Sequence, residues 1–123
     1  MNNLHTTNKL FGMIGIVIIG RNESKRLALC FESMSQVVCK KIYVDSGSSD
    51  NSVELAKEYQ LDVVELDSSR PFSAARARNE GFERLIQLNP DVEFVQFIDG
   101  DCTLLPGWRS EERRVGKECR SRW

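Results

Sequence analysis

The sequence predicts an α/β fold in which a mostly parallel sheet alternates with helices. Short runs rich in β-branched residues alternate with segments of helical periodicity, an order typical of parallel strands joined by crossover helices. The apolar run at residues 13–19 is nearly continuous, as expected for a central strand covered on both faces. The chain has 123 residues, of which 41% are hydrophobic and 28% charged, so we expect a folded globular domain.

The elements follow one another as strand, helix, strand, helix, strand, helix, strand. The expected strands cover residues 13–19, 41–44, 62–66 and 94–98.

Local signals place the helices between these strands. Ser24 is suited to cap the first helix, and Asn51 with Glu54 suits a capping box for the second. The third helix is expected over residues 73–88, where Asn89 and the following proline stop it.

Composition excludes several classes of protein. The formal net charge of −1 lacks the basic excess of a nucleic-acid binder. With four cysteines, no C-x-x-C pair and one histidine, a zinc cluster is not expected. The apolar run is far shorter than the ~20 residues of a membrane span. Three of the four cysteines precede the last 15 residues of the chain. Because an odd number of cysteines without a disulfide framework favours reduced thiols, we expect a cytoplasmic protein.

The last 15 residues differ in character from the body. They hold six of the 17 basic residues and three of the 18 acidic ones. This segment, 109–123, resembles a sequencing adapter translated in frame, so we expect a non-native tail. Residues 1–108 are then expected to form a partial domain, truncated near Trp108.

Four acidic side chains follow three of the expected strands. Glu23 comes just after the first strand, Asp45 ends the second, and Asp99 and Asp101 end the fourth. Ligands of open α/β sheets bind beyond the carboxyl ends of the strands. Two carboxylates ~4 Å apart repel by about 4 kcal/mol at an effective dielectric near 20, so either a cation joins them or they bind separate donors. A lone aspartate is more simply a cap or turn former, which we favour for Asp50; for the set we favour a binding site.

Four ordered blocks carry a family resemblance. IVIIGRNE at 16–23, VDSGSSDNS at 44–52, ARNEG at 77–81 and FIDGD at 97–101 resemble the successive motifs of family 2 glycosyltransferases with the GT-A fold. The resemblance covers about residues 14–108, and four motifs in order are far more specific than a lone D-x-D. It implies a Rossmann-like GT-A nucleotide-binding half.

The resemblance also implies roles for particular residues. Glu23 and Asp45 would contact the nucleoside, and Arg78 with Asn79 the sugar-nucleotide. Asp99 would contact ribose and sugar, and Asp99 and Asp101 would bind the Mg²⁺ or Mn²⁺ that bridges the diphosphate. Ser46 stands where many relatives carry a second aspartate.

The implied reaction is metal-dependent, inverting transfer of a sugar from a nucleotide diphosphate sugar to an acceptor hydroxyl. The family places its general base on a later segment, so no residue here is assigned as catalytic, and the acceptor stays open. The expected partner is the donor, with no nucleic acid and no membrane span in this chain; the full-length enzyme could sit at the inner membrane face.

Two alternatives remain beside this interpretation. Residues 97–103 also fit the D-x-D-x-T strand end of haloacid-dehalogenase-like phosphohydrolases, with Asp99 as the phosphoryl-accepting nucleophile. Such enzymes normally open with this strand, whereas three strand-like units precede it here. The other alternative is a non-functional fragment, because a sheet that ends on its fourth strand exposes an unpaired edge.

Overall fold

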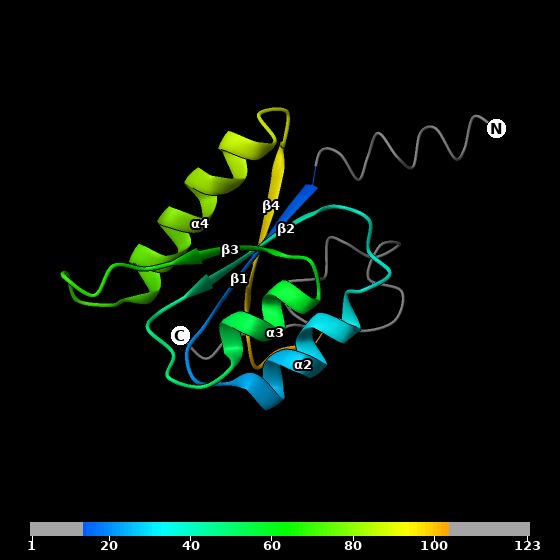
Figure 1. The fold of residues 1–123 in the computed structure, drawn as a ribbon. Helices are drawn as coiled ribbons and strands as arrows, with labels where there is room; N and C mark the ends of the chain where they lie inside the picture. Colours follow the sequence, from blue (N-terminus) through cyan, green and yellow to red (C-terminus); the bar gives the residue numbers. More distant parts are fainter. Residues whose placement is uncertain (1–13, 104–123) are drawn as a thin grey trace, which may run out of the picture.

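Four parallel strands form one sheet in the order β3-β2-β1-β4 (Figure 1). The structure, a computed structural model, describes residues 14–103. The expectation of a non-native tail at 109–123 lies outside the described residues. The strands are β1 at Ile14–Gly20, β2 at Lys40–Asp45, β3 at Asp62–Glu65 and β4 at Phe94–Asp99. All four predicted strands and their parallel pairing are therefore confirmed.

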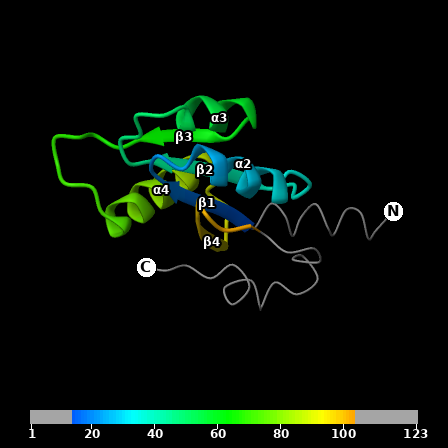
Figure 2. The same cartoon turned by 90° about the horizontal axis from the view of Figure 1, so that it is seen from below.

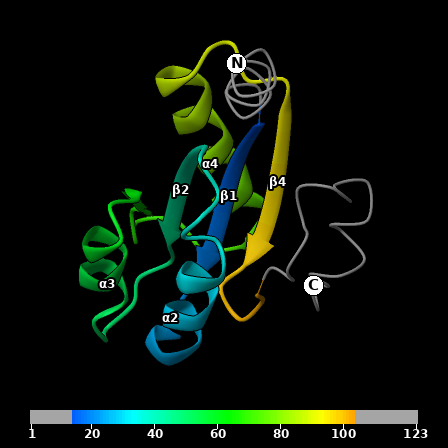
Figure 3. The same cartoon turned by 90° about the vertical axis from the view of Figure 1, so that its right-hand side faces the viewer.

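Helices cover both faces of this sheet. Helix α2 (Ser24–Ser33) and helix α3 (Ser52–Glu58) lie on one face, and helix α4 (Ala74–Leu88) lies on the other (Figures 2 and 3). No helix within residues 14–103 is both long and apolar enough to cross a membrane.

Strand β1 supplies the centre of two cores because its side chains alternate between the faces. Ile16 and Ile18 are fully buried with the residues under α2 and α3, whereas Val17 is fully buried on the α4 side. Helix α4 packs closely on that side because Gly81 has no side chain. A Cβ at Gly81 would lie 2.5 Å from a methyl carbon of Val17.

One side chain caps the amino ends of both α2 and α3, and it belongs to neither of the two predicted caps. The capping box does not form, because Asn51 makes no side-chain cap bond, and Ser24 is the first residue of α2 rather than its cap. Instead Asp50 accepts from the backbone N–H of Ser52 at 3.0 Å and from that of Ser24 at 3.2 Å. The expectation that Asp50 is a turn and cap residue is confirmed. Ser73, expected as the first residue of the third helix, is instead the cap of α4, since its hydroxyl accepts from the N–H of Arg76 at 3.1 Å.

Strand β4 forms one edge of the sheet. Strand β4 pairs only with β1, and its Phe94 and Phe97 side chains are 59% and 38% exposed. Among the described residues, Cys30, Cys39 and Cys102 form no disulfide with one another.

Candidate functional site

The strand order reverses at β1, which places its carboxyl end between those of β2 and β4. Asp45 is in register with Gly20, and Asp99 with Ile19. Because neighbouring strands lie ~4.8 Å apart, the two aspartate backbones flank β1 about 10 Å from each other. The topology thus gathers these two predicted site residues at the switch point, where open α/β sheets bind their ligands.

The two aspartates nevertheless belong to different faces of the sheet. Residues in register on neighbouring strands point to the same face, and Ile19 packs in the core under α4. Asp45 follows Tyr43 by two residues, and Tyr43 packs under α2 and α3. A ligand that contacts both carboxylates must therefore lie across the end of β1.

Glu23 and Asp101 meet on either side of one arginine. The Nη1 atom of Arg26 lies 3.7 Å from Oε2 of Glu23 and 3.9 Å from Oδ2 of Asp101. Burial, and then the charge of Asp101, raise the pKa of Glu23, while Arg26 acts in the opposite direction. Arg26 is thus the counter-ion of this acidic pair. Sequence reasoning missed it, although its position three residues after Glu23 at the start of a helix is a usable signal.

The carboxylate of Asp45 holds its own loop in place. Its Oδ1 accepts from the Tyr43 hydroxyl at 2.7 Å and from the Ser48 hydroxyl at 2.6 Å, and its Oδ2 accepts from the Ser48 N–H at 2.8 Å. An ionised carboxylate accepts about four hydrogen bonds, so most of this capacity is already used. With 2% exposure, Asp45 shapes the loop after β2 from inside.

The loops after β1 and β2 are tied together through Asn22. Its backbone N–H donates to the Ser48 hydroxyl at 2.8 Å, and its side-chain oxygen accepts from the Ser49 N–H at 2.7 Å. Asn22 has a φ of 52°, a conformation that asparagine adopts more readily than most residues. The first two motifs of the sequence therefore form one connected edge.

The structure separates the two predicted site residues on α4. Arg78 is half buried, whereas Asn79 is exposed. Asn79 lines an open hollow of about 720 Å³ together with Arg70, Arg76 and Glu80, and none of the predicted carboxylates lines it. Helical geometry explains this placement, since Asn79 lies two residues, or about 200°, from the sheet-facing Ala77.

Arg76, which the sequence reasoning passed over, organises the segment between β3 and α4. Its guanidinium donates to the backbone oxygens of Arg70 at 3.0 Å and Asp67 at 2.8 Å. Two guanidinium groups lie near the ring of Phe72, with 5.5 Å from its centroid to Cζ of Arg21 and 5.8 Å to Cζ of Arg76. Arg76 and Phe72 therefore bring this segment against the carboxyl edge of the sheet.

The donor atoms at this edge suit a hard cation, although a preformed site is not evident. Within residues 14–103 no group of three or more His, Cys, Asp or Glu side chains is placed to hold a metal ion. Asp99 and Asp101 offer carboxylate oxygens, and Mg²⁺ is commonly held by one or two carboxylates together with substrate phosphates. The residues present are compatible with that arrangement.

A family model and a solved structure identify the class of protein to which this fold belongs. The model of the family described as Glycosyl transferase family 2 matches residues 15–111, and the chain belongs to this family. Its parallel sheet with interleaved helices is the Rossmann-like fold of GT-A glycosyltransferases.

One similar solved structure is glucosyl-3-phosphoglycerate synthase from Mycobacterium tuberculosis, in complex with Mn²⁺, uridine diphosphate and glucosyl-3-phosphoglycerate. It shares 22% sequence identity with this chain at a TM-score of 0.61, over 89% of this chain and 40% of that one. The chain thus spans less than half the length of that protein. No curated protein matches the chain in sequence.

Proposed function

We propose that this chain is the donor-binding portion of a glycosyltransferase that transfers a sugar from a nucleotide diphosphate sugar to an acceptor hydroxyl, with inversion and with a divalent cation. The observation that carries the proposal is the gathering of Glu23 and Asp101 around Arg26 at the switch point, beside Asp45 and Asp99. The family match supports the reaction class. It also favours this reading of the D-x-D motif over a phosphohydrolase in which Asp99 is a nucleophile.

Each residue has a proposed role in holding the donor. Glu23 and Asp45 bind the nucleoside, with Asp45 presented by Tyr43 and Ser48. Asp99 binds ribose and sugar, and Asp99 and Asp101 hold the cation. A bound Mg²⁺ or Mn²⁺ stabilises the charge that develops on the departing diphosphate.

The basic residues of this edge complete the proposed donor site. Arg78 supplies a charge-assisted contact to the diphosphate, and a guanidinium can bind phosphate oxygens in a bidentate manner. Asn79 contacts the sugar-nucleotide only if the donor extends into the hollow that Asn79 shares with Arg76. The neighbour's crystal ligands, Mn²⁺ and uridine diphosphate, support the choice of cation and donor class.

Calorimetry tests the proposal directly. The chain is titrated with uridine, guanosine, cytidine and thymidine diphosphates, each with and without Mn²⁺. We expect Mn²⁺-dependent binding of at least one of them, weakened about tenfold or more in Asp99→Asn and Asp101→Asn, as for loss of a charge-assisted contact. Asp91→Asn, an exposed aspartate beyond the amino end of β4, is the matched control and should bind like the parent. Absence of Mn²⁺-dependent binding by all four nucleotides would contradict the proposal.

A further inference from the structure

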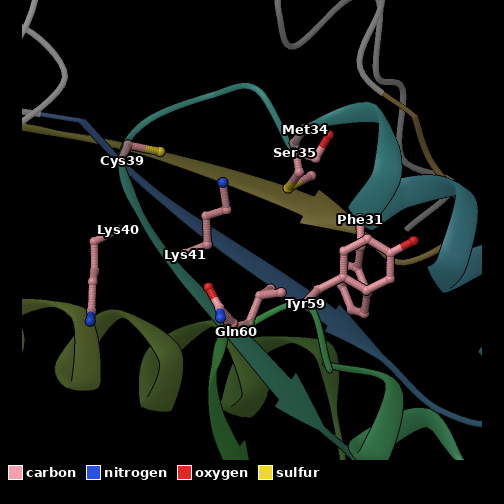
Figure 4. A pocket seen from close by; sticks show the side chains of 9 residues that line it. Phe31, Met34, Ser35, Cys39, Lys40, Lys41, Tyr59 and Gln60 are labelled. Carbon is pink, nitrogen blue, oxygen red and sulfur yellow. The ribbon is translucent and has the colours of Figure 1, made fainter. Parts of the chain in front are cut away.

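A second cavity opens at the opposite end of the sheet from the acidic edge. It has a volume of about 290 Å³ and lies between the last turn of α2, the end of α3 and the start of β2 (Figure 4). Its walls include Phe31, Met34, Tyr59 and Leu61. Phe31 and Met34 are each 1% exposed, so this wall belongs to the packed core.

The turn after α3 builds one side of this cavity. The N–H of Gln60 donates to the Lys57 carbonyl at 2.9 Å, and the N–H of Leu61 donates to the Ala56 carbonyl at 3.1 Å. This pair of bonds is a Schellman motif, with Gln60 in the left-handed conformation at φ 64°. The motif fixes the direction of the chain, so the wall is present without a ligand.

One ammonium group enters the cavity, whose walls also include Ser35, Cys39, Lys40 and Gln60. Lys41 lies on the same face of β2 as Tyr43, and Figure 4 shows its side chain extending into the cavity between Cys39 and Gln60. Its sequence neighbour Lys40 extends to the opposite side, towards α4. Within residues 14–103 the Lys41 ammonium makes no ion pair.

The nearby acidic groups do not neutralise Lys41. Burial raises the pKa of Cys39 to about 11, so this thiol stays uncharged at neutral pH. Glu32 accepts a 2.9 Å hydrogen bond from the Tyr59 hydroxyl instead. Desolvation lowers the pKa of Lys41, and the opposing effect of Cys39 is smaller.

We propose that this cavity binds a small monocarboxylate with an aromatic or branched aliphatic body, the carboxylate on Lys41 and the body against the half-buried Tyr59 and Leu61. The one ammonium group that points into the cavity balances the charge of a monoanion, whereas phosphate carries more charge and more bound water. The volume is at the lower end of ligand pockets, about 300 to 1,000 Å³, and so suits a molecule of one ring. This site is separate from the donor site, and no step of the inference uses the proposed function.

Titrations of the full ¹⁵N-labelled chain by NMR test the proposal, with phenylacetate and 4-methylpentanoate as probes. We expect saturable shifts of the amide signals around the cavity with both acids. Phenylacetamide, which has the same body without the charge, should bind about tenfold more weakly, and inorganic phosphate should produce no saturable shift there. Equal binding of acid and amide, or no binding of either acid, overturns the proposal. This comparison uses the parent chain and therefore does not depend on any variant.

Two variants identify the cation. Lys41→Met keeps a long side chain and removes the charge, and it should weaken phenylacetate binding about tenfold. Lys40→Met makes the same change on the neighbouring residue of the other face and should leave binding unchanged. Equal effects of the two substitutions, or none from Lys41→Met, would show that Lys41 does not hold the ligand. Unchanged far-ultraviolet circular dichroism and thermal midpoint establish that each variant is folded.

Discussion

The hydroxyl of Tyr43 donates a 2.7 Å hydrogen bond to Oδ1 of Asp45, and both residues are buried. The ring of Tyr43 packs edge-on against Phe31, with 5.7 Å between the ring centroids. This pair therefore connects the core under α2 and α3 to the polar edge where β2 ends. Because the other partner of Oδ1 is Ser48, the same carboxylate joins the core to the loop after β2.

Removal of that hydroxyl should destabilise the fold. In Tyr43→Phe the Oδ1 atom of Asp45 keeps the Ser48 hydroxyl but loses the Tyr43 donor, and a hydrogen bond to a charged group contributes about 1.5–3 kcal/mol. Urea denaturation at pH 7 measures the loss of unfolding free energy. The matched control is Tyr59→Phe, whose lost hydrogen bond to Glu32 is exposed and should cost less than about 0.5 kcal/mol. Equal losses in both variants would contradict a special role for the Tyr43–Asp45 bond.

The pH dependence of stability should include a contribution from Glu23. Burial, and then Asp101, raise the pKa of Glu23 above its ordinary value of 4.5. A carboxyl group with a raised folded-state pKa contributes stability that is fully present below its unfolded pKa and is lost as pH rises through the folded pKa. Glu23→Gln cannot lose this proton, so its unfolding free energy should improve relative to the parent between pH 4 and pH 7, by less than about 1 kcal/mol.

Urea denaturation at both pH values checks this expectation. Glu93→Gln changes an exposed carboxylate at the amino end of β4 and should show no such relative gain. A Glu23→Gln variant that loses stability relative to the parent on going from pH 4 to pH 7 would show that Arg26 outweighs burial and Asp101.

Loss of the Arg26 charge should change the pKa of Glu23 much more visibly than it changes the unfolding free energy. The Arg26 side chain is 68% exposed and its two ion pairs are 3.7 and 3.9 Å long, so Arg26→Gln should change the unfolding free energy by about 0.5 kcal/mol or less. The pKa of Glu23 should rise, because Arg26 now lowers it. Carbon-detected NMR titration of the Glu23 carboxyl measures the change. In Lys25→Gln, where the neighbouring exposed cation is removed, the Glu23 titration should move less.

Gly47 should tolerate no side chain. Its φ is 77°, and a Cβ there would lie 2.8 Å from Cε2 of Phe72. Gly47→Ala should therefore destabilise the chain by about 1–3 kcal/mol through backbone strain and displacement of the Phe72 ring. Gly20→Ala is the matched control, because its Cβ would only reach ordinary contact with the Tyr43 hydroxyl at 3.4 Å. Thermal melts compare the two, and an equally stable Gly47→Ala variant would contradict the expected strain.

Much of this molecule could be predicted from residues close together in the chain. Apolar runs and helical spacing gave the order of the elements, because burial on one or both faces imposes a period on each segment. The same reasoning placed Asp45 and Asp99 at strand ends, since a parallel sheet aligns its carboxyl ends. The ordered motifs likewise indicated the family that the match over residues 15–111 shows.

Contacts between distant segments could not be predicted in this way. The expected capping box does not form. Instead Asp50 accepts a hydrogen bond from the N–H of Ser24, which is 26 positions away in the chain. No local pattern indicates that Arg26 lies between Glu23 and Asp101, which are 78 residues apart in number and meet only when β4 pairs with β1.

The amino-acid sequence by itself determined the elements, their order and the acidic residues that end the strands, because these depend on local periodicity and turn chemistry. Only the tertiary structure decided which side chains serve the loops and which face a ligand. Asp45 accepts hydrogen bonds from Tyr43 and Ser48, Asn79 lines a separate hollow, and Lys41 lines a cavity at the other end of the sheet. The physical reason is that hydrogen-bond partners and burial are set by the packing of segments far apart in the chain.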